Sequence, residues 1–341
     1  MAKITEFLDI ILEGRDLTFD QAHDLLDVIF GGDVAEVQIA AFLAAMRVKK
    51  AAAMEIAGLA HSLREHAVRV ETGLDPDTMI DTCGTGGASL KTFNLSTAAA
   101  FAAAGAGAYV AKHGNKKITS ICGSADVLTS LGVNIAPGPD VVAECIKGAR
   151  IGFMFAPMYH PAMKHVQPVR QNLDFRTAFN ILGPLANPAG AGAQVIGVAD
   201  ISLMERIVET LKMLGTKRAM VVHSNGLDEV STMGPTNILF LKDDGSIESQ
   251  TLTPESVGMK QADYSELAGG DAETNAAIIR SILEGKEKGP KKDIVVLNAA
   301  AGIIVAGLAE SFEEGIKKAD EAIANGQAAE CLEEMIKISN S

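Results

Sequence analysis

From residue 78 onward, a short strand passes directly into a glycine-rich segment and then into an alanine-rich helix. The glycine-rich segment reads DTCGTGG over residues 81–87, and the helix begins near Asn94. Further short strands, most of them separated by helical stretches, are expected at residues 108–111, 152–155, 194–199, 219–223 and 237–241. Strands that alternate with helices are typical of a mostly parallel sheet covered on both faces, so the sequence predicts an α/β fold.

The first 70 residues show helical periodicity and no strand. The first helix places its apolar residues on one face, at Ile4, Phe7, Leu8, Ile11 and Leu12. Gly14 ends this helix, and Thr18 with Gln21 forms a capping-box pattern for a second helix that ends at Gly31-Gly32. Two more helices are expected at about 33–48 and 51–67. We therefore predict a small all-helical domain over residues 1–70, joined by a segment near 160–190, and a large α/β domain over residues 71–341.

Composition excludes several classes of protein. The chain has 341 residues, with 43 acidic and 30 basic side chains and a net charge of −13, which disfavours binding to nucleic acid or to an anionic membrane. Its four cysteines lack metal-ligand spacing. The N-terminus carries acidic residues within its apolar stretch, unlike a signal peptide, and the alanine-rich run at 96–111 is too weakly apolar to span a membrane. We expect a cytoplasmic protein.

The DTCGTGG segment and the helix after it suit an anion. Glycines after a strand let the backbone approach an anion closely, and a helix N-terminus presents unpaired N–H groups and a positive dipole end. Hydroxyls that suit phosphate oxygens follow at Thr85, Thr92, Ser96 and Thr97. The spacing fits neither the dinucleotide-binding nor the P-loop pattern. A tight strand–helix turn without a ligand is the structural alternative.

A second polar cluster, KHGN at residues 112–115, follows the second expected strand. Ligands of open α/β sheets lie beyond the carboxyl ends of the strands, so Lys112 is expected at the same edge as Gly84 and would pair with phosphate. Ser120 and Ser124 would complete the phosphate cradle. A single lysine after a strand is more often just solvated.

Two other features would complete a site at this edge. Asp228 and Glu229 follow the strand at 219–223 and, facing bound phosphates, would hold Mg²⁺, although adjacent carboxylates usually mark a solvated turn. Arg170 would bind a substrate carboxylate through two parallel hydrogen bonds. From its residue type alone, a surface or interdomain salt bridge explains Arg170 better.

Together these motifs resemble the anthranilate phosphoribosyltransferase family over nearly the whole chain. The GTGG loop is shared with the wider group of nucleoside-phosphorylase-like enzymes, whereas KHGN, the arginine after HPAMK, and GPLANP in this order are more specific. The matching motifs are QIAAFL at 38–43, MR at 46–47, DTCGTGG at 81–87, FNLST at 93–97, KHGN at 112–115, GSADVL at 123–128, FAPMYHPAMK at 155–164, VR at 169–170, RTAFNILGPLANP at 176–188 and GLDE at 226–229.

The resemblance implies a magnesium-dependent pentosyltransferase of tryptophan biosynthesis, which moves the 5-phosphoribosyl group of phosphoribosyl pyrophosphate (PRPP) to the amino group of anthranilate. The implied PRPP-binding residues are Gly84, Thr85, Gly86, Gly87, Thr92, Asn94, Ser96, Thr97, Lys112 and Ser124. The implied anthranilate-binding residues are Gly84, His113, Asn115 and Arg170. Ser96, Asp228 and Glu229 would hold Mg²⁺, with two ions per active site. Lys112 and Arg170 would act by position and charge, without a covalent nucleophile. A homodimer formed through the helical domain is also implied.

The sequence departs from the family pattern at three positions. Ala88 follows GTGG where an acidic residue is common, which leaves one carboxylate fewer near the pyrophosphate. Cys122 replaces the usual serine before Gly123, and Lys116 replaces a frequent arginine. Two other readings stay open: a pyrimidine nucleoside phosphorylase, which the KHGN and HPAMK contexts oppose, and a non-catalytic nucleic-acid-binding relative, which the net charge opposes.

Overall fold

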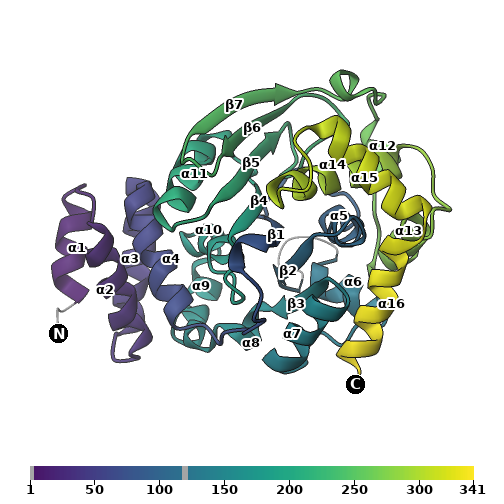
Figure 1. Ribbon diagram of the computed structural model, residues 1–341. Helices are drawn as coiled ribbons and strands as arrows, with labels where there is room; N and C mark the ends of the chain where they lie inside the picture. Colours follow the sequence, from purple (N-terminus) through teal and green to yellow (C-terminus); the bar gives the residue numbers. More distant parts are fainter. Residues whose placement is uncertain (1–3, 117–121) are drawn as a thin grey trace.

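The computed structural model describes residues 4–116 and 122–341 and contains a small helical domain beside a large α/β domain (Figure 1). This arrangement confirms the predicted fold class. Ser120 lies outside the described residues. In the part of the chain that is described, no helix is long and apolar enough to cross a membrane.

The helical domain begins with four helices, α1 (Ile4–Leu12), α2 (Phe19–Phe30), α3 (Glu36–Lys49) and α4 (Ala53–Glu65). The predicted capping box of α2 is present, with Thr18 and Gln21 each accepting from the other's backbone N–H. A later segment packs on the same core and comprises α8 (Ala156–Tyr159), η2 (Pro161–His165), α9 (Gln167–Leu173), α10 (Phe179–Leu182) and η3 (Gly183–Leu185). Apolar side chains from this later segment, Val166, Leu182 and Leu185 among them, are buried with Phe42 of α3.

Seven strands form one sheet in the order β3-β2-β1-β4-β5-β6-β7. The strands are β1 (Met79–Gly84), β2 (Tyr109–Gly114), β3 (Ile151–Phe155), β4 (Ala193–Gly197), β5 (Arg218–Ser224), β6 (Thr236–Leu241) and β7 (Ile247–Leu252). Pairing is parallel from β3 to β5 and antiparallel for β6 and β7. The carboxyl ends of β1, β2, β4 and β5 therefore point to one edge of the sheet, where the chain leaves each strand.

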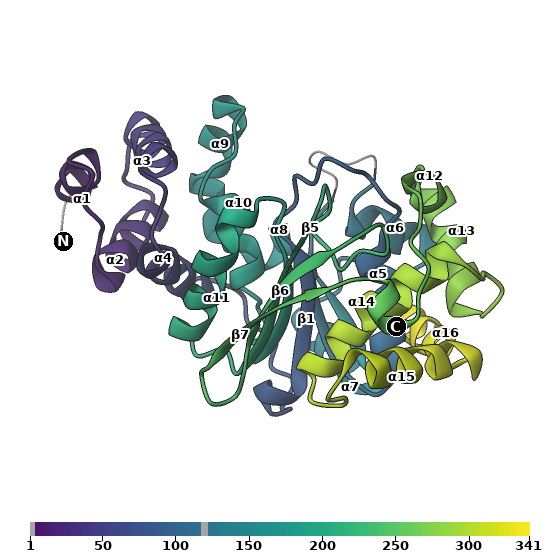
Figure 2. The same ribbon diagram turned by 90° about the horizontal axis from the view of Figure 1, so that it is seen from above.

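Helices cover both faces of the sheet. On one face, α11 (Met204–Met213) lies between the sheet and the helical domain. On the other face lie α5 (Leu95–Gly105), α6 (Ser124–Leu131), α12 (Tyr264–Leu267), α13 (Ala272–Leu283), α14 (Pro290–Val305), α15 (Phe312–Ala324) and α16 (Gln327–Ser339). The helix α7 (Pro139–Gly148) packs against Ala111 and Met154 near the β3 edge, on the same face as α11. Figure 2 shows α1–α4 at one end of the molecule and α13–α16 at the other.

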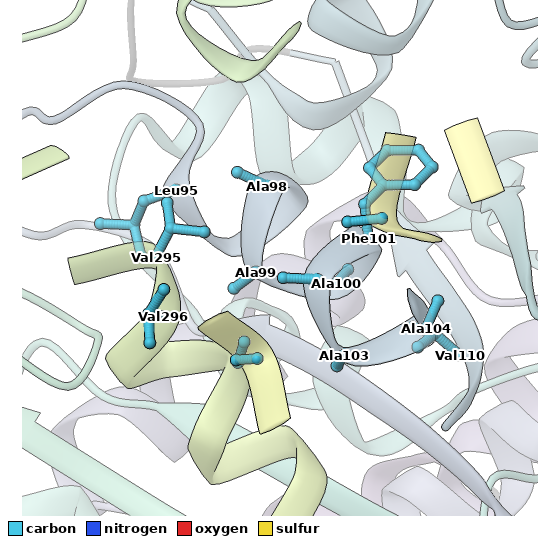
Figure 3. Packing of buried hydrophobic residues seen from close by; sticks show 14 of the residues in the cluster. Leu95, Ala98, Ala99, Ala100, Phe101, Ala103, Ala104, Val110, Val295 and Val296 are labelled. Atoms are coloured by element: carbon cyan, nitrogen blue, oxygen red, sulfur yellow. The ribbon is translucent and has the colours of Figure 1, made fainter. Parts of the chain in front are cut away.

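The alanine-rich helix α5 lies at the centre of the main core. Residues 98–104 are all buried, and Figure 3 shows Ala99 and Ala100 beside Val295 and Val296 of α14. Small side chains on every face allow a helix to lie close to neighbours on all sides, whereas an amphipathic helix has one solvated face. The alanine run expected to be too weakly apolar for a membrane is thus a central buried helix, whose N-terminus is fixed at the sheet edge.

Two details differ from the sequence-based expectation. The strand β7 was not predicted, because its residues are mostly exposed and polar and show little apolar alternation. The strand β2 runs on to Gly114, since it pairs with β3 as far as Phe155. Lys112 and His113 therefore lie within a buried strand and not in a loop beyond it.

Candidate active site

The GTGG loop leaves β1 and turns beside β4. Thr85 donates its N–H to the carbonyl of Gly197 at 2.8 Å, and Gly86 donates its N–H to Oδ2 of Asp228 at 2.9 Å. Gly86 and Gly87 both have positive φ values, of 68° and 85°. Asp228 thus already occupies one N–H group of the loop that was predicted to bind an anion.

Asp228 approaches the sheet very closely. A Cβ atom on Gly197 would overlap the main-chain carbonyl of Asp228, so only glycine fits at the end of β4. Gly197 was not among the predicted site residues. It ends a strand and pairs with Gly84 in the sheet, but this neighbourhood is known only once the strand order is known.

A cavity lies under the GTGG loop and contains both predicted metal-binding carboxylates. It is lined by Thr82, Cys83, Gly84, Ser96, Ala99, Val195, Gly197, Val222, Asp228, Glu229 and Asn298. Burial raises the pKa of Asp228, and it raises the pKa of Glu229 well above its usual range, with the Asp228 charge adding to the effect. Among the described residues, neither carboxylate has an ion-pair partner. Two desolvated carboxylates that lack an ion-pair partner in the described part of the chain, together with the Ser96 hydroxyl in the same cavity, are a donor set that fits Mg²⁺.

Lys112 lies next to this cavity, hydrogen-bonded to one of its lining residues. It is buried, and its Nζ donates to the carbonyl oxygen of Thr82 at 2.7 Å. Burial lowers the pKa of Lys112, an effect opposed chiefly by the nearby charge of Asp81. The alternative considered for Lys112, a solvated lysine after a strand, is therefore not what the structure shows.

A buried hydrogen-bond network that the sequence analysis missed supports β1 and β2. Asp81 accepts from Nδ2 of Asn187 at 2.8 Å and from the N–H of His113 at 3.3 Å. Asn187 also donates to the carbonyl of Ala111 at 2.7 Å. Burial raises the pKa of Asp81 to about 6, against the opposing charge of Lys112. An acidic residue inside an otherwise apolar strand was the signal for this network.

The predicted phosphate-side residues differ in how they face the site. Ser96 lines the cavity, and Asn94 connects two loops by donating to the carbonyl of Cys122 at 3.2 Å and accepting from Asn275 at 2.9 Å. Thr92 donates to the carbonyl of Phe93 at 3.1 Å, and Ser124 donates to the carbonyl of Asn115 at 3.2 Å.

Thr97 is one of several predicted phosphate-side residues that do not line the cavity. Its side chain is fully buried within α5 and is not among the cavity-lining residues. Successive residues of a helix point about 100° apart, so Ser96 and Thr97 point in different directions. That Thr97 contributes to phosphate binding stays a prediction.

The predicted anthranilate-side residues gather around the segment formed by α10 and η3. His113 is buried, and its Nδ1 lies 3.2 Å from the carbonyl of Gly183. Arg170 of α9 stacks over the ring of Phe179, 5.5 Å from its centroid. Within residues 4–116 and 122–341, Arg170 has no ion-pair partner, so the salt bridge considered as its alternative role is not seen there. Asn115 is exposed where the chain leaves β2.

Two buried histidines face each other behind this segment. The ring centroids of His113 and His160 are 5.0 Å apart. Burial lowers the pKa of His113 to about 3, with a further contribution from His160, and burial lowers the pKa of His160 to about 4. Both rings are therefore neutral at pH 7, and Nε2 of His113 is buried without a hydrogen-bond partner in the described residues.

We expect the contribution of His113 and His160 to the free energy of unfolding to fall as the pH is lowered from 7 to 5, a trend that the raised pKa of Asp81 opposes. Histidine in an unfolded chain binds its proton near pH 6.5, above the folded-state pKa of both rings, so the unfolded state binds more protons in this window. Each histidine then lowers stability by up to about 1.4 kcal/mol per pH unit. In urea unfolding series at three pH values, His160→Phe should remove one of these two contributions. The exposed His61→Phe is the control, and an unchanged slope in His160→Phe contradicts the expectation.

Comparison with known proteins gives matches over both domains. Residues 5–67 match the model of the glycosyl transferase family helical bundle domain, and residues 76–329 match that of the glycosyl transferase family a/b domain. An anthranilate phosphoribosyltransferase from Desulfatibacillum aliphaticivorans is 48% identical over 98% of each chain.

Solved structures give the same result. The anthranilate phosphoribosyltransferase of Thermus thermophilus superposes with a TM-score of 0.92 at 40% identity, covering 98% of this chain and 99% of that one. The Saccharomyces cerevisiae protein, solved in complex with PRPP and Mg, gives 0.88 at 28% identity over 99% and 98%. It has also been solved with 4-fluoroanthranilate. With a full-length match to both domains and to these relatives, the chain belongs to the anthranilate phosphoribosyltransferase family.

Proposed function

We propose that this chain transfers the 5-phosphoribosyl group of PRPP to the amino nitrogen of anthranilate and releases pyrophosphate, a step of tryptophan biosynthesis. Besides family membership, the proposal is supported by the position of three features of the site. The GTGG loop, the buried carboxylates of Asp228 and Glu229, and the α10–η3 segment that contacts His113 and Arg170 all follow strands or helices at one edge of the sheet.

PRPP is proposed to bind over the GTGG loop. The N–H of Gly87, the N-terminus of α5 and, once Asp228 releases it, the N–H of Gly86 would donate to its phosphates. The remaining contacts are assigned to Gly84, Thr85, Thr92, Asn94, Ser96 and Ser124. Lys112 would favour the departing pyrophosphate as a buried positive charge, since a charge acts strongly where water is excluded.

Magnesium is proposed to bind at Asp228, Glu229 and Ser96. Bound there, the ion would supply positive charge to the pyrophosphate leaving group. The chain's own part is to hold two carboxylates close together in a desolvated cavity, where their mutual repulsion favours a cation.

Anthranilate is proposed to bind between His113, Asn115 and Arg170, with Gly84 at the side of PRPP. Arg170 would hold the carboxylate through its two parallel N–H groups. The bond from ribose C1 to the pyrophosphate oxygen breaks and the bond from C1 to the amine nitrogen forms, with loss of one amine proton. An aromatic amine is neutral at pH 7, so this step depends on alignment more than on a strong base.

We expect Arg170→Ala to lower kcat/KM for anthranilate by roughly ten- to a hundredfold, because a charged hydrogen-bonding partner of the carboxylate is lost. The measurement is the loss of anthranilate fluorescence with PRPP and Mg²⁺. Arg170→Lys keeps the charge and should recover part of the loss. Arg280→Ala, which removes a surface ion pair with Glu333, is the control.

An unchanged fluorescence with folded wild-type protein contradicts the assignment. Phosphate-dependent cleavage of thymidine in the same preparation then supports the nucleoside phosphorylase reading. Equal anthranilate kinetics in Arg170→Ala and wild type contradict the carboxylate role alone.

We further propose two Mg²⁺ ions per active site. Chelation should abolish turnover, and equilibrium dialysis against the PRPP-bound protein should give a count of two that falls in Asp228→Asn and in Glu229→Gln. A count of one in the wild type, or a count of two in both variants, contradicts this proposal.

A homodimer formed through the helical domain is also proposed. Leu12 of α1 is 69% exposed, and Val37 and Val48 of α3 are 76% and 84% exposed, on helices at the end of the molecule away from the sheet (Figure 2). Exposed aliphatic side chains on neighbouring helices are typical of an association surface.

We expect the wild type to sediment as a dimer and Val48→Glu to shift it toward the monomer, because a buried charge would destabilise the interface. The control is Ile201→Glu, since Ile201 is 55% exposed but lies outside the helical domain. A wild-type monomer at micromolar concentration, or an intact dimer in Val48→Glu, contradicts this surface.

A further inference from the structure

Arg176 lies in the link between α9 and α10 and reaches across to the GTGG loop. Its Nη1 donates to the carbonyl of Gly86 at 2.6 Å, and its Nη2 donates to the carbonyl of Thr85 at 2.9 Å. One guanidinium thus holds two successive carbonyls in its planar fork. The loop is thus held by two charge-assisted bonds from a residue 90 positions away in sequence.

The loop is shaped to accept this side chain. Gly87 has a φ of 85°, and a Cβ atom at this position would overlap Nη1 of Arg176. Any other residue type at position 87 would therefore displace the guanidinium as well as strain the backbone.

The two bonds set the direction of the loop's N–H groups. In a trans peptide the C=O and N–H point to opposite sides. Because Arg176 holds the carbonyls of Thr85 and Gly86, the N–H groups of Gly86 and Gly87 face away from it. The N–H of Gly86 does so in the structure, where it donates to Asp228. These are the N–H groups assigned above to the phosphates of PRPP.

The backbone of Arg176 is tied to the helical domain. Arg47 of α3 donates to the carbonyl of Arg176 at 2.5 Å and stacks over the ring of Phe175 at 4.9 Å. Two residues before Arg176, Asp174 ends α9 in a left-handed conformation, with a φ of 47°. The helix ended in this way carries Arg170.

We propose that Arg176 is a positioning residue that couples the two substrate sites, by holding the PRPP loop in register with the helix that carries the anthranilate-binding Arg170. This inference rests on the proposed function. Its consequence is that each substrate's site depends on Arg176 although neither substrate needs to touch it.

The test is a kinetic comparison of Arg176→Ala, Arg176→Lys and wild type. Arg176→Ala should raise KM for PRPP about tenfold and KM for anthranilate at least threefold, and Arg176→Lys should recover part of both effects through its single ammonium. Arg206→Ala is the matched control, since Arg206 also donates to two backbone carbonyls, of Ala51 and Ser202, but away from the cavity.

A second measurement needs no catalysis. Amide hydrogen exchange at Gly86 and Gly87 should be faster by about tenfold in Arg176→Ala and unchanged in Arg206→Ala. Without substrates this measurement is independent of the reaction, so it stands even if the wild type fails to consume anthranilate and the proposed function falls.

Three results overturn the coupling. Kinetics and loop exchange equal to those of wild type remove any role for Arg176. Arg176→Ala could raise KM for PRPP alone, with KM for anthranilate and amide exchange in the loop unchanged. That result would show Arg176 to be a direct PRPP ligand. Equal losses in Arg176→Ala and Arg206→Ala, with lowered melting temperatures in both, reduce the effect to general stability.

Discussion

The arrangement of the site depends on one close contact, that of Asp228 with the end of β4. The main chain of Asp228 lies against Gly197, and its carboxylate accepts from Gly86, 142 residues earlier in the chain. These contacts place the segment after β5 directly over the ends of β1 and β4. A side chain on Gly197 would push the segment away and separate the carboxylates from the loop, so the residues proposed to bind metal and the loop proposed to bind phosphate share one geometric requirement.

The site is surrounded by buried charges that cost stability. Asp81, Lys112 and Glu229 are all desolvated, and isolated charges are expensive inside a protein. Hydrogen bonds from Asn187 and His113 to Asp81, and from Lys112 to Thr82, offset part of this cost. In return, these three side chains place fixed charges at or beside a water-poor cavity, where electrostatic effects on a leaving group are largest.

The sequence predicted the elements better than their contacts. Strand–glycine–helix order and helical periodicity located β1, α5 and the helical domain, because local pattern determines them. The burial of the Thr97 side chain within α5 could not be read from its hydroxyl alone. Lys112 was placed beyond β2 because the pairing with β3 that extends the strand is non-local. Arg176 and Gly197 were missed for the same reason: their importance arises only when distant segments meet.

A thiol at the cavity and an imidazole beside it are not activated for covalent catalysis. Cys83 is the one thiol among the lining residues, and burial raises its pKa well above the usual range, so it stays protonated and is a poor nucleophile. The neighbouring His113 is neutral and hydrogen-bonded to Gly183. Because neither of these two groups is an activated nucleophile, the proposed reaction would depend on holding the amine and ribose C1 in line. That requirement explains why the site joins two domains: the groups proposed to hold PRPP belong to the sheet edge, whereas Arg170 belongs to the segment packed with the helical bundle. Alignment of the two substrates is then a property of the domain contact itself.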